Sequence, residues 1–137
     1  MILTSKQEAR QYMSQGQSLY SQENYEESIK CLNKSISLCP DLKTAYKWRA
    51  LSYFKSKQMD KSVADFTKVI TYAPASSLYY IYRSTVYKTW AMLNGKDKTN
   101  LYKLSFDDIE KSLSIEPGNA TAIVSRAFLY EKLGKKI

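Results

Sequence analysis

The sequence predicts an all-α fold of about seven helices, arranged as a solenoid of antiparallel helix pairs. Pro40 and Pro74 lie 34 residues apart, and each ends a segment with the same internal layout. A period of this length is typical of stacked helix–turn–helix units. Only four glycines and three prolines occur in 137 residues, so little of the chain can be loop. We therefore expect residues 1–137 to form a single domain.

Segments offset by 34 residues carry matching residue types. In the first half of each segment the aligned columns are Tyr12, Tyr46 and Tyr80; Gly16, Ala50 and Ser84; and Leu19, Tyr53 and Tyr87. In the second half Tyr25 aligns with Met59, Ser28 with Ser62, Leu32 with Phe66, Ser35 with Val69, and Ile36 with Ile70. This order of aromatic, small and large apolar residues, closed by proline, resembles the tetratricopeptide repeat over residues 9 to 133. The resemblance implies a right-handed superhelical array whose concave groove binds a peptide.

The first two repeats, at about 9–42 and 43–76, each predict one helix pair. The expected helices run from Thr4 to Ser21, Tyr25 to Leu38, Lys43 to Lys55, and Asp60 to Tyr72. Asn24 is the expected N-cap of the second helix, because its side chain can accept from a free amide of the first turn. Pro40 and Pro74 end the second helix of each pair, since proline cannot continue the helical hydrogen-bond ladder.

The third repeat, at about 77–119, contains an insertion. Its closing proline, Pro117, follows Pro74 by 43 residues, so nine extra residues fall near 88–101. Ser105, Ile109, Ser112 and Leu113 then take the places of Ser62, Phe66, Val69 and Ile70. Lys88–Leu93 can continue the first helix, and Gly95–Asn100 is expected to be a solvated loop. Trp90, Met92 and Leu93 on this extension either fold back on the adjacent helix or protrude to contact a partner.

Residues 120–133 predict one last helix, with no second helix after it. Ile123, Ala127 and Tyr130 take the places of Tyr46, Ala50 and Tyr53. A terminal helix of a solenoid needs a polar outer face, but this one is apolar on most sides. The natural protein could continue, another chain could cover the helix, or it could be an ordinary cap. One hypothesis is therefore self-association through Ile123, Ala127 and Tyr130.

Arginine and aspartate occur together in the second and third repeats. Arg49, Arg83 and Arg126 share one place in the first helix of a pair, and Asp65 and Asp108 share one place in the second. The first repeat has Gln15 and Cys31 there. This pattern indicates structural ion pairs, because a guanidinium can grip a carboxylate with two hydrogen bonds. The pairs could lie within a repeat, as Arg49–Asp65 and Arg83–Asp108, or across repeats, as Arg83–Asp65 and Arg126–Asp108.

The composition argues against an enzyme. There is no histidine, which removes the commonest general base and metal ligand, and the isolated glycines form no phosphate-binding loop. Cys31 and Cys39 lie about 12 Å apart along one predicted helix, too far for a disulfide. We expect no cofactor, no metal, no secretory signal and no membrane span. Two reduced cysteines favour a cytoplasmic protein.

The expected function is therefore binding, through a groove lined by the first helices of the repeats. By helical spacing, and by the resemblance, the groove residues are Met13, Gln17, Lys47, Trp48, Leu51, Lys55, Leu78, Tyr82, Thr85, Lys88 and Phe128. This set is rich in apolar and aromatic residues, which dominate binding energy at interfaces. The expected partner is an apolar protein segment that can also carry acidic residues opposite Lys47, Lys55 and Lys88, within a larger complex.

The residues also bear on two other binding modes, a clamp for chaperone C-termini and nucleic-acid binding. Some tetratricopeptide repeats hold the acidic C-termini of chaperones with a clamp of Lys, Asn and Arg, but the matching positions here are Met13, Gln17, Trp48, Leu78 and Tyr82. We therefore expect no such clamp. Residues 43–103 carry twelve Lys and Arg against three acidic residues, so nucleic-acid binding is the alternative. The lysines scatter around the helices, which favours a protein partner.

Overall fold

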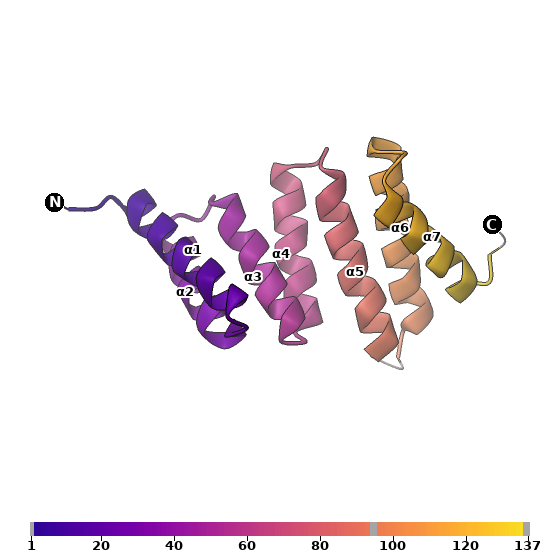
Figure 1. Cartoon of the computed structure of the whole chain (residues 1–137), viewed down its shortest axis with the longest axis horizontal. Coiled ribbons are helices and arrows are strands. Elements are labelled where there is room, and N and C mark those ends of the chain that lie inside the picture. Colours follow the sequence, from indigo (N-terminus) through magenta and orange to yellow (C-terminus); the bar gives the residue numbers. More distant parts are fainter. Residues whose placement is uncertain (1, 94–95, 136–137) are drawn as a thin grey trace. The chain divides into compact units, whose positions relative to one another are not determined.

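The computed structural model describes residues 2–93 and 96–135, and every regular element in these ranges is an α-helix (Figure 1). The helices are α1 (Ser5–Ser21), α2 (Tyr25–Leu38), α3 (Lys43–Lys55), α4 (Met59–Tyr72), α5 (Ser77–Leu93), α6 (Lys98–Ile115) and α7 (Ala120–Lys132). The chain divides into two compact units, Met1–Tyr72 with α1 to α4 and Ala73–Ile137 with α5 to α7. The predicted all-α class and helix order are confirmed. The single domain stays a prediction.

The first two helices begin at different kinds of N-cap. Thr4 caps α1 in a capping box, because its hydroxyl accepts from the Gln7 amide while the Gln7 side chain accepts from the Thr4 amide. Asn24 stands at the N-cap of α2, but its side chain makes no capping hydrogen bond. Its ψ of 73° departs from the extended backbone of Thr4, whose ψ is 162°. The prediction for Asn24 was therefore right in position and wrong in mechanism.

Small residues let the paired helices of unit 1 approach closely. A Cβ atom added to Gly16 would lie 2.6 Å from Leu32 Cγ, so α1 and α2 pack without space for a methyl group there. The Ser28 hydroxyl donates to the Gly16 carbonyl at 2.6 Å, and the Ser62 hydroxyl donates to the Ala50 carbonyl at 2.8 Å. The aligned serines thus donate to a backbone carbonyl of the partner helix at equivalent positions in the two helix pairs. These hydrogen bonds help to fix how each pair packs.

The insertion in unit 2 lengthens two helices rather than one loop. The α5 helix has 17 residues where α3 has 13, and α6 has 18 where α4 has 14. The predicted loop is wrong for Lys98–Asn100, which form the first turn of α6; Gly95 lies outside the described residues. The helices continue because Ala91 and Leu101, on the two extensions, are both buried in one apolar cluster.

The apolar residues of the extension divide between core and surface. Trp90 is half-buried and packs against the core cluster of unit 2. Met92 and Leu93 are 56% and 60% exposed at the end of α5. The extension therefore folds back on its neighbour through Trp90 and also presents two apolar side chains to solvent.

The remainder of unit 2 follows the predicted alignment. Ser105, Ile109, Ser112 and Leu113 are all buried, as their counterparts on α4 are. Ser84 and Ser105 exchange hydrogen bonds with each other's carbonyls at 2.9 Å, which joins α5 to α6. The α7 helix packs on α6 and contributes Ala122 and Leu129 to the core.

Candidate docking surfaces

The predicted groove residues of unit 1 lie on two helices that pack against each other, α1 and α3, and we call this set the α1–α3 face: Met13, Gln17, Lys47, Trp48, Leu51 and Lys55. The Trp48 ring on α3 lies 5.4 Å from the Tyr20 ring on α1, with the two planes tilted by 58°. The Lys47 ammonium lies 4.6 Å from the centre of the Trp48 ring, within cation–π range. The two helices therefore hold an aromatic pair with a cation beside it.

The α1–α3 face is accessible. Gln17 and Lys55 are exposed, and Met13, Lys47, Trp48 and Leu51 are half-buried. None of these side chains is withdrawn into the core. Half-buried aromatic and aliphatic side chains are held in place by the fold but can still lose more surface to a partner, which is the usual condition of an interface anchor.

The remaining groove residues lie in unit 2, on what we call the α5–α7 face: Leu78, Tyr82, Thr85, Lys88 and Phe128. Leu78 is 47% exposed, and the other four are half-buried. The Lys88 ammonium lies 5.3 Å from the centre of the Phe128 ring, so α5 and α7 meet through this pair. The Thr85 hydroxyl donates to the Ile81 carbonyl of its own helix at 2.9 Å, so its hydrogen is not available to a ligand, whereas its oxygen can still accept.

The three residues proposed for self-association are not equivalent. Ile123 and Ala127 on α7 are exposed, although Tyr46 and Ala50 are buried at the same places on α3. Tyr130 is half-buried, with its ring 5.5 Å from the Phe106 ring of α6. Tyr130 therefore contributes to the packing of unit 2, and of the three residues only Ile123 and Ala127 are exposed.

The arginines and aspartates pair within repeats. Arg49 donates to Asp65 through Nε and Nη2, both at 2.8 Å, and Arg83 donates to Asp108 at 2.8 and 2.6 Å. Hydrogen bonding to Asp108 raises the pKa of Arg83, so this guanidinium stays charged. In the first repeat the Cys31 thiol lies 3.8 Å from the Gln15 amide oxygen instead. The pairs hold α3 to α4 and α5 to α6, and their role is structural.

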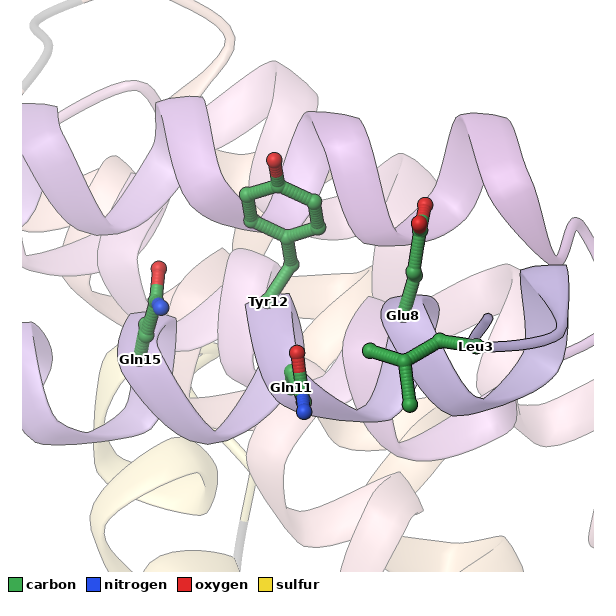
Figure 2. A pocket seen from close by; sticks show the side chains of 5 residues that line it. All are labelled: Leu3, Glu8, Gln11, Tyr12 and Gln15. Carbon is green, nitrogen blue, oxygen red and sulfur yellow. The ribbon is translucent and has the colours of Figure 1, made fainter. Parts of the chain in front are cut away.

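A shallow polar cavity beside Tyr12 was missed by the sequence reasoning. It has a volume of about 190 Å³ and is lined by Leu3, Glu8, Gln11, Tyr12 and Gln15. Glu8, Tyr12 and Gln15 project from the same side of α1 (Figure 2). The available signal was that Gln11 and Gln15 stand where the second repeat has Ala45 and Arg49. Both glutamines are exposed, as is usual for polar side chains.

Residues 2–93 and 96–135 contain neither a metal-binding cluster nor a helix that could span a membrane. No group of three or more histidine, cysteine, aspartate or glutamate side chains in the described part of the chain is placed to hold a metal ion. No helix described here is long and apolar enough to cross a bilayer.

Comparison with known proteins identifies the repeats. A family model described as TPR repeat matches residues 16–57, and one described as tetratricopeptide repeat matches residues 44–76. A curated relative, the Protein STIP1 homolog of Dictyostelium discoideum, is 27% identical over 118 residues. The match covers 82% of this chain but 18% of the relative, so the chain spans less than a fifth of that protein.

Solved structures show the same fold. The Arabidopsis OM64 TPR domain has a TM-score of 0.79 at 20% identity, with 93% of this chain and 98% of that one covered. The first TPR of Spaghetti (RPAP3), bound to the HSP90 peptide SRMEEVD, has a TM-score of 0.79 at 20% identity and covers 98% and 100%. The second TPR domain of human RPAP3, in complex with the HSP70 peptide SGPTIEEVD, has a TM-score of 0.75 at 21% identity and covers 96% and 99%. Residues 16–76 therefore match tetratricopeptide-repeat models, and the chain has the fold of tetratricopeptide-repeat domains.

Proposed function

We propose that this chain is a protein-interaction module whose α1–α3 face binds an apolar protein segment, as part of a larger assembly. The observation that carries the proposal is the half-buried cluster of Tyr20, Trp48 and Lys47. Tryptophan and tyrosine bring a large contact area at a low cost in conformational entropy, and they are enriched among the residues that dominate binding energy. Two solved domains of the same fold have peptides bound, which supports a peptide as the class of ligand.

The charges around this face favour a segment with acidic residues among its apolar ones. Lys47 lies against the Trp48 ring, and Lys55 is exposed at the end of α3. A carboxylate placed near either ammonium would gain a favourable electrostatic contact, worth roughly 0.2–1 kcal/mol at an exposed position. The apolar contacts would therefore supply most of the affinity, and the lysines would help to orient the ligand.

We further propose that recognition does not use the chaperone-tail clamp. Met13, Gln17, Trp48, Leu78 and Tyr82 stand at the clamp positions and provide no cationic side chain to hold a terminal carboxylate. The HSP90 peptide SRMEEVD, bound by one solved relative, is a suitable probe. By fluorescence anisotropy, SRMEEVD and its C-terminally amidated form should bind equally weakly. Tight binding that is lost on amidation would show that this part of the proposal is wrong.

A selection from a random peptide library displayed on phage tests the main proposal. Wild-type protein should enrich apolar and aromatic peptides, and Trp48→Ala should abolish their binding. Tyr53→Ala is the matched control, because Tyr53 is also a half-buried aromatic on α3 but lies beside Arg49 and Lys61. The control should reduce stability while peptide binding persists in the folded fraction. Equal binding by wild type and Trp48→Ala would contradict the assignment of this face.

Self-association through α7 is a second candidate function. Ile123 is 42% exposed and Val124 is 70% exposed on this helix, so it presents apolar surface to solvent. Light scattering should report a mass above that of the monomer for wild type and a monomer for Ile123→Glu. The exposed Ile123 is the better site for this test, because Tyr130→Glu would also disturb the contact with Phe106. A wild-type mass equal to the monomer would end this proposal.

A further inference from the structure

Two lysines from different helices of unit 2 meet around one aromatic ring. The ammonium groups of Lys88 on α5 and Lys132 on α7 each lie 5.3 Å from the centre of the Phe128 ring. They therefore lie within twice that distance of each other. Each is attracted to the negative face of the ring, but the two like charges also repel. A group of opposite charge that reached both would relieve this repulsion.

The fold holds the ring in place. Phe128 is half-buried and packs against the core cluster of unit 2. Its ring also meets the buried Tyr102 ring of α6 edge-on, with centres 6.3 Å apart and planes at 65°. Lys132 follows Phe128 by one helical turn, which keeps the two side chains on the same side of α7. The three residues form a site whose centre is rigid, so little order has to be created when a ligand binds.

No carboxylate of the described residues occupies this site. The ion pairs found within residues 2–93 and 96–135 join Lys30 to Glu27, Arg49 to Asp65, and Arg83 to Asp108. Arg49 and Arg83 are thus already paired with aspartates. Lys88 and Lys132 retain their capacity to donate to an oxygen ligand, since an ammonium carries three donors.

Apolar surface continues from the ring along α7. Val124 lies one turn before Phe128 and is 70% exposed. Val124, Phe128 and Lys132 are therefore spaced four residues apart and form a stripe that runs from apolar to aromatic to cationic. A phosphate-rich polymer would gain nothing from the apolar end of this stripe. A protein segment with an acidic side chain next to an apolar one would use its whole length.

We propose that Lys88 and Lys132 together receive a side-chain carboxylate of a protein partner, while Phe128 and Val124 receive the apolar side chain beside it. The inference rests on the proposed function, because it assigns the chemistry of the bound segment at the α5–α7 face. To the general preference for acidic residues it adds one defined pair of lysines, on α5 and α7.

The same displayed-peptide selection, repeated with two double variants, tests this assignment. Wild type should enrich peptides in which Asp or Glu adjoins an apolar residue. The Lys88→Gln/Lys132→Gln variant should lose the acidic preference and keep the apolar one. The Lys103→Gln/Lys111→Gln variant removes two exposed lysines from α6, so it has the same net charge and should behave like wild type. A selected peptide should bind the first variant about tenfold more weakly by fluorescence anisotropy.

The outcomes separate this inference from the proposed function. Apolar peptides selected by wild type without any acidic preference would overturn the inference and leave the proposed function intact. An equal loss of acidic preference in both double variants would also overturn it, because net charge alone would then explain the result. If wild type enriched no peptide, the proposed function and this inference would both fall.

Discussion

The second and third repeats join their helix pairs with the same ion pair, yet the third repeat has the longer helices. Arg49–Asp65 and Arg83–Asp108 have nearly identical bidentate geometry. Each of α5 and α6 exceeds its counterpart by four residues. The middle of each helix pair is therefore fixed by specific contacts. At its end, the two helices can be longer where apolar residues on both of them are buried together. The first repeat, with Gln15 and Cys31, lacks the ion pair altogether.

Breaking an ion pair should cause the largest loss in the free energy of unfolding. Asp108→Ala leaves the Arg83 guanidinium without its main partner, and we expect a loss of about 3 kcal/mol in the free energy of unfolding. Urea unfolding followed by Trp90 fluorescence in a Trp48→Phe background would report on unit 2 alone, because the chain has two tryptophans. The neighbouring Asp107 is exposed, so Asp107→Ala should change the free energy of unfolding by less than about 0.5 kcal/mol. Equal losses in the two variants would argue against a structural role for the pair.

The extension of the third repeat can be tested next. Trp90→Ala should lower the free energy of unfolding by about 2 kcal/mol, because the half-buried ring packs against the core of unit 2. Met92→Ala is its control, since Met92 is largely exposed on the same helix and its truncation should cost less than about 0.5 kcal/mol. Far-ultraviolet circular dichroism during urea unfolding measures both. A Trp90→Ala variant as stable as wild type would mean that the Trp90 ring contributes nothing to the stability of the core.

The close approach of α1 and α2 gives the third prediction. Gly16→Ala should lower the free energy of unfolding by about 1 kcal/mol, because the strain of overpacking against Leu32 exceeds the gain in helix propensity. At Gly118 an added Cβ would meet no atom within 4 Å, so Gly118→Ala should be close to neutral. Thermal melting of the two variants would compare them directly. A more stable Gly16→Ala variant would show that α1 and α2 can move apart without loss.

The smallest effect concerns pH. Hydrogen bonds from Asn119 and Ser77 lower the pKa of Glu116 from its ordinary value of 4.5. A carboxyl group whose pKa is lower in the folded state adds stability above its unfolded pKa, and this contribution is lost as the pH falls through the folded pKa. Ser77→Ala should therefore destabilise the protein slightly at pH 7 and match wild type near pH 2. A difference that persists unchanged at low pH would exclude Glu116 as its source.

The fold could be predicted largely from periodicity. The prolines 34 residues apart and the aligned small residues give α1 to α4 nearly residue for residue, because each helix pair repeats the same packing problem. The start of α6 could not be predicted in this way. Lys98, Thr99 and Asn100 are polar and follow a turn signal, and we attribute their helical structure to the burial of Ala91 and Leu101 in one apolar cluster. That cluster joins two helices and has no local signature in the sequence.

The candidate surfaces were predictable only in part. Helical spacing placed Trp48 and Lys47 on the surface of α3, but it gave no sign that the Trp48 ring would meet Tyr20. The choice between the two arginine–aspartate pairings also required the structure, because either register satisfied the sequence. The cavity beside Tyr12 is lined by side chains particular to the first repeat, and a repeat pattern describes only what the repeats share.

The two indole signals in an ¹H–¹⁵N correlation spectrum offer the most direct test of peptide docking at Trp48. Trp48 lies on the α1–α3 face with Tyr20, whereas Trp90 packs against the core of unit 2. On titration with a selected peptide, the Trp48 indole signal should shift in proportion to occupancy, while the Trp90 signal stays nearly constant. A titration that moves the Trp90 signal and leaves the Trp48 signal unchanged would contradict the proposed docking surface.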